Sequence, residues 1–381
     1  MIDEAWLREA ADVEEAAALT AQLVAIRSYP GEEGAVQRAV AAWLSDHGLR
    51  PEFQATVDDR PNVIARVENG PAPTLLFNGH TDTVLAVDGW DGDPWQGWRD
   101  GDKLYGLGAC DMKSGVAAAM LATRALASRP DLWRGTLIFT AVVDEEAYSV
   151  GAHALIDAGI TADACVVTES SWAMPSLGGP GKVLVRMDVT GKATHATWPE
   201  GGINAAVEAA RFVARLHEVP PTTHPRIAAS QSVLSFHSGS EQYVITVPEH
   251  ARVLINRHLV PGEKGEHVLA QMRALAASLD SPARFDFTID PPYYPPWETD
   301  VDHPLTDCLA RAYEAEAGHP PRFGYRMFGD ANLFSAEAGI PTVQIGPDGG
   351  AFHEADEWVS IASIAATTRV LLRLATDLLA P

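Results

Sequence analysis

Short, uninterrupted apolar runs mark the strands that the sequence predicts. Three of them, at 74–77, 137–143 and 164–167, have strand length and lack the polar alternation of a half-exposed strand, and a fourth lies at 341–345. Elsewhere, apolar residues recur at helical spacing. The pattern predicts an α/β domain with a further strand at 61–67 and helices at 3–26, 33–47, 113–128, 303–316, near 331–338 and 360–379.

Acids and a histidine follow three of these runs directly. His80 and Asp82 follow the first run, Glu145 and Glu146 follow the second, and Glu169 follows the third. Ligands in open α/β sheets bind at the carboxyl ends of the strands, so we expect these side chains to converge at one sheet edge. A solvated charge run would not be expected immediately after a buried strand. The placement therefore favours a functional site over surface acidity.

A glycine-rich turn lies between the first two of these strands. The segment 105–115 reads Tyr-Gly-Leu-Gly-Ala-Cys-Asp-Met-Lys-Ser-Gly and carries Asp111 near its centre. Glycines let the backbone bend sharply and approach other groups closely. The helix predicted from 113 begins beside Asp111, and its amino terminus favours negative charge there. We expect Asp111 to lie at the same sheet edge.

From Gly181 onward the pattern changes to that of a separate, smaller domain. Strands are predicted at 182–189, 228–236, 251–259 and 284–289, with helices at 203–217 and 264–279. This β-α-β-β-α-β order is that of the ferredoxin-like split βαβ unit. The proline-rich segment 291–297 is predicted as a stiff connector. We therefore predict a catalytic domain formed by 1–180 and 295–381, interrupted by an inserted α+β domain at 181–294.

Composition narrows the class of protein. The 381 residues suffice for two domains, and 46% hydrophobic with 21% charged residues is typical of a globular protein. The net charge of −23 argues against a nucleic acid or an anionic membrane as partner. The amino terminus is acidic where a signal peptide would be basic, and no apolar run approaches the length of a membrane span. Three cysteines without CxxC spacing fit a reduced, cytoplasmic protein.

The residues at the predicted sheet edge have the chemistry of a two-metal site. Zinc binds histidine nitrogen and carboxylate oxygen, and a pair of ions needs a bridging carboxylate with further ligands on each side. Asp111 could bridge, with His80 and Glu169 on one ion and Glu146 and His353 on the other. A lone histidine is more often structural than a ligand, and adjacent acids are usually solvated. Their position after apolar strands favours the metal site.

The same residues form a motif series that resembles a known family. It is the dizinc metallopeptidase and deacylase family of acetylornithine deacetylases, succinyl-diaminopimelate desuccinylases, glutamate carboxypeptidases and aminoacylases. The resemblance covers nearly the whole chain, in order, including the inserted domain. The motifs are His80-Thr-Asp82-Thr, Gly108-Ala-Cys-Asp111-Met-Lys-Ser-Gly115, Glu145-Glu146, Glu169 and His353.

The resemblance implies a role for each of these residues. The implied metal ligands are His80, Asp111, Glu146, Glu169 and His353. Glu145 is implied to be the general base that takes a proton from a metal-activated water and returns it to the leaving amine. Asp82 is implied to orient the imidazole of His80 through its other ring nitrogen. The implied fold is a mixed-sheet, zinc-exopeptidase-like catalytic domain with an inserted ferredoxin-like dimerisation or lid domain.

Two residues of the inserted domain also match family motifs. His195, in Gly191-Lys-Ala-Thr-His195, is implied to reach the partner's site in a homodimer and stabilise an oxyanion. Arg257 is implied to bind the substrate carboxylate with two parallel hydrogen bonds. Without the resemblance, His195 would be interpreted as a turn residue and Arg257 as a surface ion-pair partner. The segments 245–248 and 327–329 depart from the pattern at positions that contact substrate in some relatives, so specificity is not transferred from any one relative.

The sequence thus predicts a metal-dependent amidohydrolase with two divalent ions, zinc with cobalt or manganese as alternatives. Its expected substrate is an N-acyl amino acid, as in deacetylases, desuccinylases and aminoacylases. A metallo-carboxypeptidase or dipeptidase acting on short peptides stays open. A binding or scaffolding homologue without catalysis is the alternative from another class. Loss of an implied ligand or of Glu145 would favour that last hypothesis, and each of these residues is present.

Overall fold

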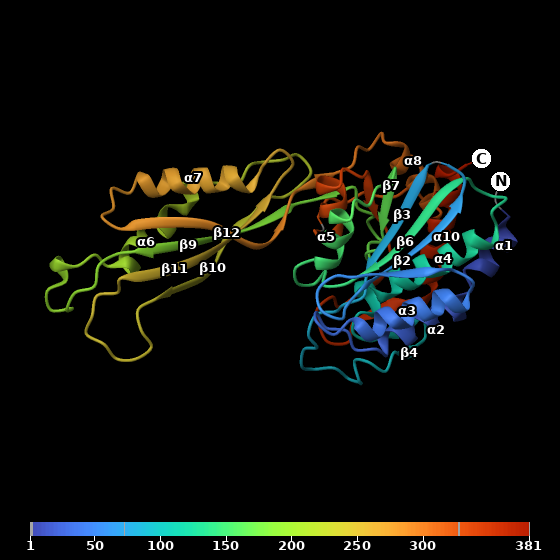
Figure 1. Cartoon of the computed structure of the whole chain (residues 1–381), viewed down its shortest axis with the longest axis horizontal. Helices are drawn as coiled ribbons and strands as arrows, with labels where there is room; N and C mark the ends of the chain where they lie inside the picture. The colour runs from blue at the N-terminus through green and yellow to red at the C-terminus, as the bar shows by residue number, and fades with distance from the viewer. Residues whose placement is uncertain (1–2, 72, 327, 381) are drawn as a thin grey trace. The chain divides into compact units, whose positions relative to one another are not determined.

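The computed structural model describes residues 3–71, 73–326 and 328–380, so Met327 of the departing segment lies outside the described residues. The chain forms two compact units (Figure 1). Unit 1 comprises Met1–Gly178 and Glu298–Pro381, and unit 2 comprises Gly179–Trp297. Among the helices in the described residues, none combines the length and the apolar character that crossing a bilayer requires.

Unit 1 is built on a six-stranded mixed sheet with the order β1-β2-β6-β3-β7-β14. β3 pairs in parallel with β6 and β7, and β14 pairs in parallel with β7, while β1 and β2 are antiparallel. The predicted α/β class with a mixed sheet is therefore confirmed. The strands are β1 (Pro51–Gln54), β2 (Asn62–Asn69), β3 (Thr74–His80), β6 (Gly135–Val142), β7 (Ala164–Val167) and β14 (Thr342–Gln344).

The parallel strands of this sheet end at one edge, as the apolar runs predicted. β6 and β7 are apolar and almost wholly buried, which fits strands covered on both faces. In the register of the sheet, His80 lies opposite Val142, and Asn78 lies opposite Val167. The residues that follow β3, β6 and β7 are therefore delivered to the same edge.

Helices cover this sheet and pack against one another. α3 contacts β1 and β2, α4 contacts β3 and β6, α8 contacts β14, and α10 packs against α2, α4 and α8. The last helix thereby ties the amino-terminal helices to the part of unit 1 that follows unit 2. The helices of unit 1 are α1 (Glu4–Ala10), α2 (Val13–Val24), α3 (Gly34–Asp46), α4 (Ser114–Ser128), α5 (Val150–Asp157), α8 (Pro304–Ala317), α9 (Asp330–Asn332) and α10 (Ile361–Leu378).

Two predicted helices are divided in the structure. The predicted helix 3–26 is two helices because Asp12 caps α2, its side chain accepting a hydrogen bond from the backbone N–H of Glu15 at 2.8 Å. The apolar spacing continues across the break, so periodicity alone did not reveal it. The predicted helix near 331–338 is the short α9 followed by a π-helical turn at Leu333–Glu337.

A second, four-stranded sheet in unit 1 accounts for part of the tryptophan-rich loop at 85–103. Its strands are β4 (Trp98–Asp100), β5 (Lys103–Tyr105), β15 (Gly349–Gly350) and β16 (Trp358–Ser360). Trp98 stacks on Tyr105 with ring centroids 5.1 Å apart, and Trp90 meets Trp98 edge-on. Trp90 and Trp98 therefore pack against neighbouring aromatic rings of this part of the structure.

Unit 2 has the predicted β-α-β-β-α-β order, with a four-stranded antiparallel sheet in the order β10-β11-β9-β12. The residues of one sheet face and of both helices form a single apolar core around Phe212. The elements are β9 (Gly181–Thr190), α6 (Ala205–Arg215), β10 (Gln231–Ser238), β11 (His250–Leu259), α7 (Gly265–Ala277) and β12 (Arg284–Tyr294).

The proline-rich segment is not wholly the connector that was predicted. β12 continues through Pro291 and Pro292 to Tyr294, beyond the predicted end at 289. Its register against β9 shifts between Asp290 and Tyr294, so the prolines lie where the regular ladder is interrupted. The chain then pairs β13 (Trp297–Glu298) with β8 (Gly178–Gly179).

The stability of unit 1 should depend on its central strands far more than on its edge. We expect Phe77→Ala in β3, where the side chain is 0% exposed, to lower the free energy of unfolding by about 3–5 kcal/mol. The matched change Phe53→Ala in edge strand β1, where the side chain is 54% exposed, should cost less than about 1 kcal/mol. Urea unfolding followed by tryptophan fluorescence measures both. Equal costs for the two variants would contradict this account of the core.

Candidate metal centre

Five sequence-predicted residues are delivered by different elements to the carboxyl edge of the main sheet. His80 is the last residue of β3, Glu146 lies in the turn after β6, and Glu169 lies two residues beyond β7. Asp111 lies in the kinked turn Ala109–Lys113 directly before α4, where its own backbone is not helical. His353 lies in the loop between β15 and β16. Residues far apart in the sequence therefore share one site.

The side chains of these residues approach one another closely. The Nε2 atom of His80 lies 3.2 Å from Oδ1 of Asp111 and 3.3 Å from Oε1 of Glu169. The Nε2 atom of His353 lies 3.3 Å from Oδ2 of Asp111 and 3.3 Å from Oε1 of Glu146. The two carboxylate oxygens of Asp111 thus face two different histidines, each accompanied by one glutamate.

This arrangement fits a pair of divalent cations. Bonds of about 2.0–2.1 Å to a tetrahedral ion place neighbouring ligand atoms about 3.3 Å apart, which agrees with these distances. Ligand atoms of His80, Asp111 and Glu146 all lie within 4.8 Å of one another. Histidine nitrogen with carboxylate oxygen is a donor set of zinc and related divalent ions. The residues present therefore fit the metal pair that the sequence predicted.

The pKa shifts of the residues at this site also favour a bound cation. Burial raises the pKa of Glu169 to about 7 and raises the pKa of Glu145 well above its usual range. Burial alone would lower the pKa of His80, but Glu169 and Asp111 raise it well above normal. Hydrogen bonds to Asp111 and Glu146 raise the pKa of His353 to about 10. The cluster thus concentrates negative charge, which a bound cation would compensate.

Asp82 connects the ends of two strands at this site. Its buried carboxylate accepts hydrogen bonds from the backbone N–H groups of Glu145 at 3.1 Å and Glu146 at 2.9 Å. Its Oδ1 atom lies 3.5 Å from Nδ1 of His80, whose shorter contact of 3.1 Å is to the backbone carbonyl of Asp82. The expected orientation of His80 by Asp82 stays a prediction. The contacts with the turn after β6 were not foreseen.

A buried acid that the sequence left without a role lies near Glu145. Asp330 begins α9, and burial raises its pKa to about 6. Its carboxylate accepts a hydrogen bond from Asn78 at 3.4 Å. The preceding Gly329 has φ +155° and lies so close to Glu145 that a Cβ atom there would collide with the carboxylate. A glycine at 329 therefore leaves space for Glu145.

Glu357 is the second residue that sequence reasoning missed. Its buried carboxylate accepts hydrogen bonds from the backbone N–H groups of Cys110 at 2.7 Å, Asp111 at 2.9 Å and Gly108 at 3.0 Å. The loop that carries His353 is thereby joined to the turn that carries Asp111. Glu357 lies in an acidic stretch, Glu-Ala-Asp-Glu, without a preceding apolar run, so the signal that identified the other acids was absent.

The predicted substrate-binding residues, His195 and Arg257, belong to unit 2. His195 is exposed, and its Nδ1 accepts a hydrogen bond from the backbone N–H of Thr197 at 3.2 Å. Arg257 is fully buried and forms an ion pair with Glu263. It also donates hydrogen bonds to the carbonyls of Val219 and Pro220 and to the side chain of Gln231. The substrate contacts of both residues stay predictions.

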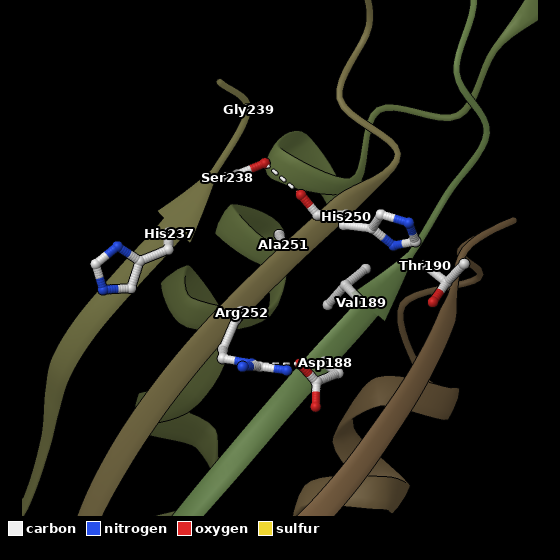
Figure 2. A pocket seen from close by; sticks show the side chains of 9 residues that line it. All are labelled: Asp188, Val189, Thr190, His237, Ser238, Gly239, His250, Ala251 and Arg252. Carbon is white, nitrogen blue, oxygen red and sulfur yellow. Dashed lines mark hydrogen bonds and ion pairs between the residues drawn. The ribbon is translucent and has the colours of Figure 1, made fainter. Parts of the chain in front are cut away.

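Unit 2 also contains a cavity of its own. It measures about 400 Å³ and is lined at the ends of β9, β10 and β11 by residues including His237 and His250 (Figure 2). In this cavity Arg252 already forms an ion pair with Asp188 at 2.7 Å. The residues that line it include none of the predicted site residues. The cavity is lined by residues of unit 2 alone.

Comparisons with known proteins match most of this chain. Residues 76–377 match the profile of "Peptidase family M20/M25/M40". The succinyl-diaminopimelate desuccinylases of Cereibacter sphaeroides and Dinoroseobacter shibae are each 30% identical to this chain. Each match covers 94% of this chain and 98% of the relative.

Solved structures share the fold over almost the whole chain. Aminopeptidase PepT from Bacillus cereus is 23% identical with a TM-score of 0.79, covering 96% of this chain and 99% of that one. An M20 family metallo-carboxypeptidase from Sulfolobus solfataricus is 15% identical with a TM-score of 0.78, covering 95% and 98%. A dinuclear metal-binding peptidase from Bacillus subtilis is 18% identical with a TM-score of 0.74, covering 99% of both chains.

Glu357 provides a test of how the site is held for metal binding. We expect Glu357→Gln to raise the dissociation constant for Zn²⁺ by about 10–100-fold, as loss of a group that supports a ligand commonly does. The amide retains a single acceptor oxygen for the three N–H groups, so the turn that carries Asp111 loosens. Isothermal titration of metal-free protein with Zn²⁺ measures the change.

The matched control for this experiment is Glu354→Gln, an exposed position in the same loop. It should leave the Zn²⁺ dissociation constant within about twofold of the wild type, because surface changes have small effects. Thermal unfolding of each metal-free variant separates loss of the site from loss of the fold. A folded Glu357→Gln protein with unchanged Zn²⁺ affinity would show that Glu357 does not support the site.

Proposed function

The chain belongs to peptidase family M20/M25/M40, and from this premise we propose that it is a metal-dependent amidohydrolase that cleaves the amide bond of an N-acyl amino acid. The observation that carries the proposal is the convergence of His80, Asp111, Glu146, Glu169 and His353 at one sheet edge beside Glu145. The desuccinylases at 30% identity support the N-acyl class of substrate.

In this proposal, the residues of the cluster would hold two divalent ions, and Asp111 would contribute to both ligand sets. His80 and Glu169 complete one ligand set, and Glu146 and His353 complete the other, as their distances to Asp111 and to each other support. Zinc is the proposed metal because the set combines imidazole nitrogen with carboxylate oxygen, and cobalt or manganese accept similar donors. When bound, such ions act as Lewis acids that acidify water and polarise an amide carbonyl.

Glu145 is proposed as the group that moves the proton. Its carboxylate lies 3.9 Å from Nε2 of His80, with a side chain that is largely buried. It takes a proton from the attacking water and delivers the proton to the leaving amine nitrogen. Burial raises the pKa of Glu145, which suits a group that must hold a proton between the two steps. The backbone of Glu145 is fixed by its hydrogen bond to Asp82.

Unit 1 is proposed as the catalytic domain and unit 2 as the lid and dimerisation domain. In this arrangement His195 would donate a hydrogen bond to the oxyanion in the site of a partner subunit, which its exposed position permits. For Arg257 to bind a substrate carboxylate, its guanidinium would have to exchange Glu263 for that ligand. The acidic net charge of −23 argues against nucleic acid or an anionic membrane as a partner. Three buried free cysteines support a reducing, cytoplasmic location.

Short peptides are the alternative substrates within the same mechanism, since a dipeptide also presents an amide next to a carboxylate-bearing residue. A catalytically inactive scaffold is disfavoured because the ligand set is complete and its members lie within contact distance of one another. Both alternatives are separated from the lead proposal by turnover.

The first test is a substrate panel run with and without metal. N-acetyl and N-succinyl amino acids and dipeptides are supplied to protein that has been stripped with a chelator and then reloaded with Zn²⁺, Co²⁺ or Mn²⁺. We expect turnover of N-acyl amino acids that disappears on stripping and returns on reloading. Turnover that survives complete metal removal would refute the proposed mechanism, and turnover of dipeptides alone would select the peptidase alternative.

The role of Glu145 is tested separately. We expect Glu145→Gln to lower kcat by about 10²–10⁴-fold, the usual contribution of a general base, while the number of Zn²⁺ ions bound is unchanged. The matched control is Glu68→Gln, at an exposed residue of β2, and this variant should retain wild-type kcat. If Glu145→Gln retained full kcat, another group would have to move the proton.

A further inference from the structure

A cavity of about 210 Å³ lies in unit 1, apart from the ligand cluster itself. Apolar side chains form much of its wall, with Arg326 and Asp348 as its charged members. The residues that line it are Ser170, Ser171, Trp172, Ala173, Met174, Ser176, Gly324, Arg326, Pro347, Asp348, Gly349 and Phe352.

The wall of this cavity is continuous with the loops of the candidate metal centre. Ser170 directly follows Glu169 in the chain, and Phe352 directly precedes His353. The hydroxyl of Ser170 donates a hydrogen bond to the backbone carbonyl of Cys110 at 2.7 Å, one residue before Asp111. The cavity therefore opens between the segments that carry Glu169 and His353, and one of these segments is hydrogen-bonded to the turn that carries Asp111.

Ordered contacts hold the cavity open as a formed pocket. The indole of Trp172 packs on the ring of Tyr313 with centroids 5.2 Å apart. The backbone around Ser176 is bridged on both sides, since its N–H bonds the carbonyl of Gln344 at 3.0 Å and the N–H of Gly324 bonds the carbonyl of Pro175 at 2.8 Å. A Cβ atom at Gly324 would lie 2.9 Å from Cγ of Met174, so the glycine leaves room for that side chain.

We propose that this cavity is the specificity pocket of the amidohydrolase and takes an aromatic or large aliphatic group attached to the scissile amide. The inference rests on the proposed function. An apolar cavity of about 150 Å³ accommodates benzene, so about 210 Å³ suffices for a phenyl group. Trp172, Met174 and Phe352 supply apolar and aromatic surface for such a group. Its closeness to the residues that carry Glu169 and His353 brings a group bonded to the reacting amide within reach.

Selectivity for large groups follows from burial of the added atoms. One methylene in an apolar enzyme pocket commonly changes kcat/KM by about 10–200-fold. A benzyl side chain replaces the methyl of alanine with six further carbons, so a preference of at least about 10²-fold is expected. Whether the group is carried on the amino acid or on the acyl side is a distinction that the experiment makes.

The experiment measures kcat/KM of the Zn²⁺-loaded full-length protein in two arms. The first arm varies the amino acid among N-acetyl-alanine, N-acetyl-leucine, N-acetyl-phenylalanine and N-acetyl-glutamate. The second arm varies the acyl group among N-acetyl-alanine, N-succinyl-alanine and N-benzoyl-alanine. We expect kcat/KM to rise by at least about 10²-fold with apolar size in one of the two arms, which identifies the side of the amide that the pocket serves.

Two variants connect that preference to the cavity. Trp172→Ala removes one wall, and Ala173→Leu narrows the space, so each should reduce the large-to-small ratio of kcat/KM by about tenfold or more. The matched control is Trp43→Ala, at a half-buried tryptophan on α3 that does not line the cavity, and it should leave the ratio unchanged.

A binding measurement tests the proposed pocket independently of substrate turnover. Isothermal titration of Zn²⁺-loaded Glu145→Gln with N-acetyl-phenylalanine and N-benzoyl-alanine should show binding of at least one probe, and adding Trp172→Ala should weaken it by about tenfold or more.

The proposed pocket and the proposed function would be overturned by different results. Equal kcat/KM across sizes in both arms, or a size preference that neither cavity variant reduces, would overturn the pocket and leave amide hydrolysis intact. A preference for N-acetyl-glutamate over N-acetyl-phenylalanine would also overturn it, in favour of an anion site at Arg326. Absence of turnover on every substrate would refute the proposed function, and the titration would then decide the pocket alone.

Discussion

The concentration of buried carboxylates at one edge of the main sheet is the constraint on which the rest of unit 1 depends. Asp111, Glu145, Glu146 and Glu169 lie close together and are mostly shielded from water. Burying negative charge without a partner is costly, and protons on His80 and His353 offset only part of it. Two divalent cations would supply four positive charges against these four carboxylates. The carboxylates can stay ionised together only when positive charge lies beside them. A bound metal ion would supply that charge.

Such a cluster also has to be kept from spreading apart, and backbone N–H groups do this. Asp82 accepts two of them from the turn after β6, and Glu357 accepts three from the turn that carries Asp111. Each carboxylate spans segments that are distant in the sequence, so each fixes the position of one ligand-bearing segment relative to another. Because each of these carboxylates is held by backbone N–H groups of a ligand-bearing turn, the two acids add rigidity at the site.

The sequence predicted those site residues that directly follow an apolar run of strand length. A run of strand length followed by an acid or a histidine identified His80, Glu146 and Glu169, and the structure places all three at one edge. Asp111 was placed by a glycine-rich turn and His353 by a loop just after the predicted strand 341–345, and the family resemblance supplied their roles. Glu357 and Asp330 were missed because their partners are backbone groups and buried side chains elsewhere in the chain, which no local pattern records. The break between α1 and α2 was missed for the opposite reason, since the apolar spacing continues across a purely local cap at Asp12.

The difference between the proposed ligands and the residues around them explains where substrate specificity can vary. The proposed ligands are attached to strand ends and anchored turns, and moving any of them would disturb the charge balance of the whole cluster. The cavity beside them is lined instead by residues such as Trp172, Ala173 and Phe352, which lie between secondary-structure elements and contact no ligand atom in the described hydrogen bonds and ion pairs. Changes there alter the shape offered to a substrate without altering the charge that holds the site together. A fold of this kind can therefore keep one hydrolytic chemistry while its substrates differ, and in the pocket that we propose the cavity wall would select the group next to the amide.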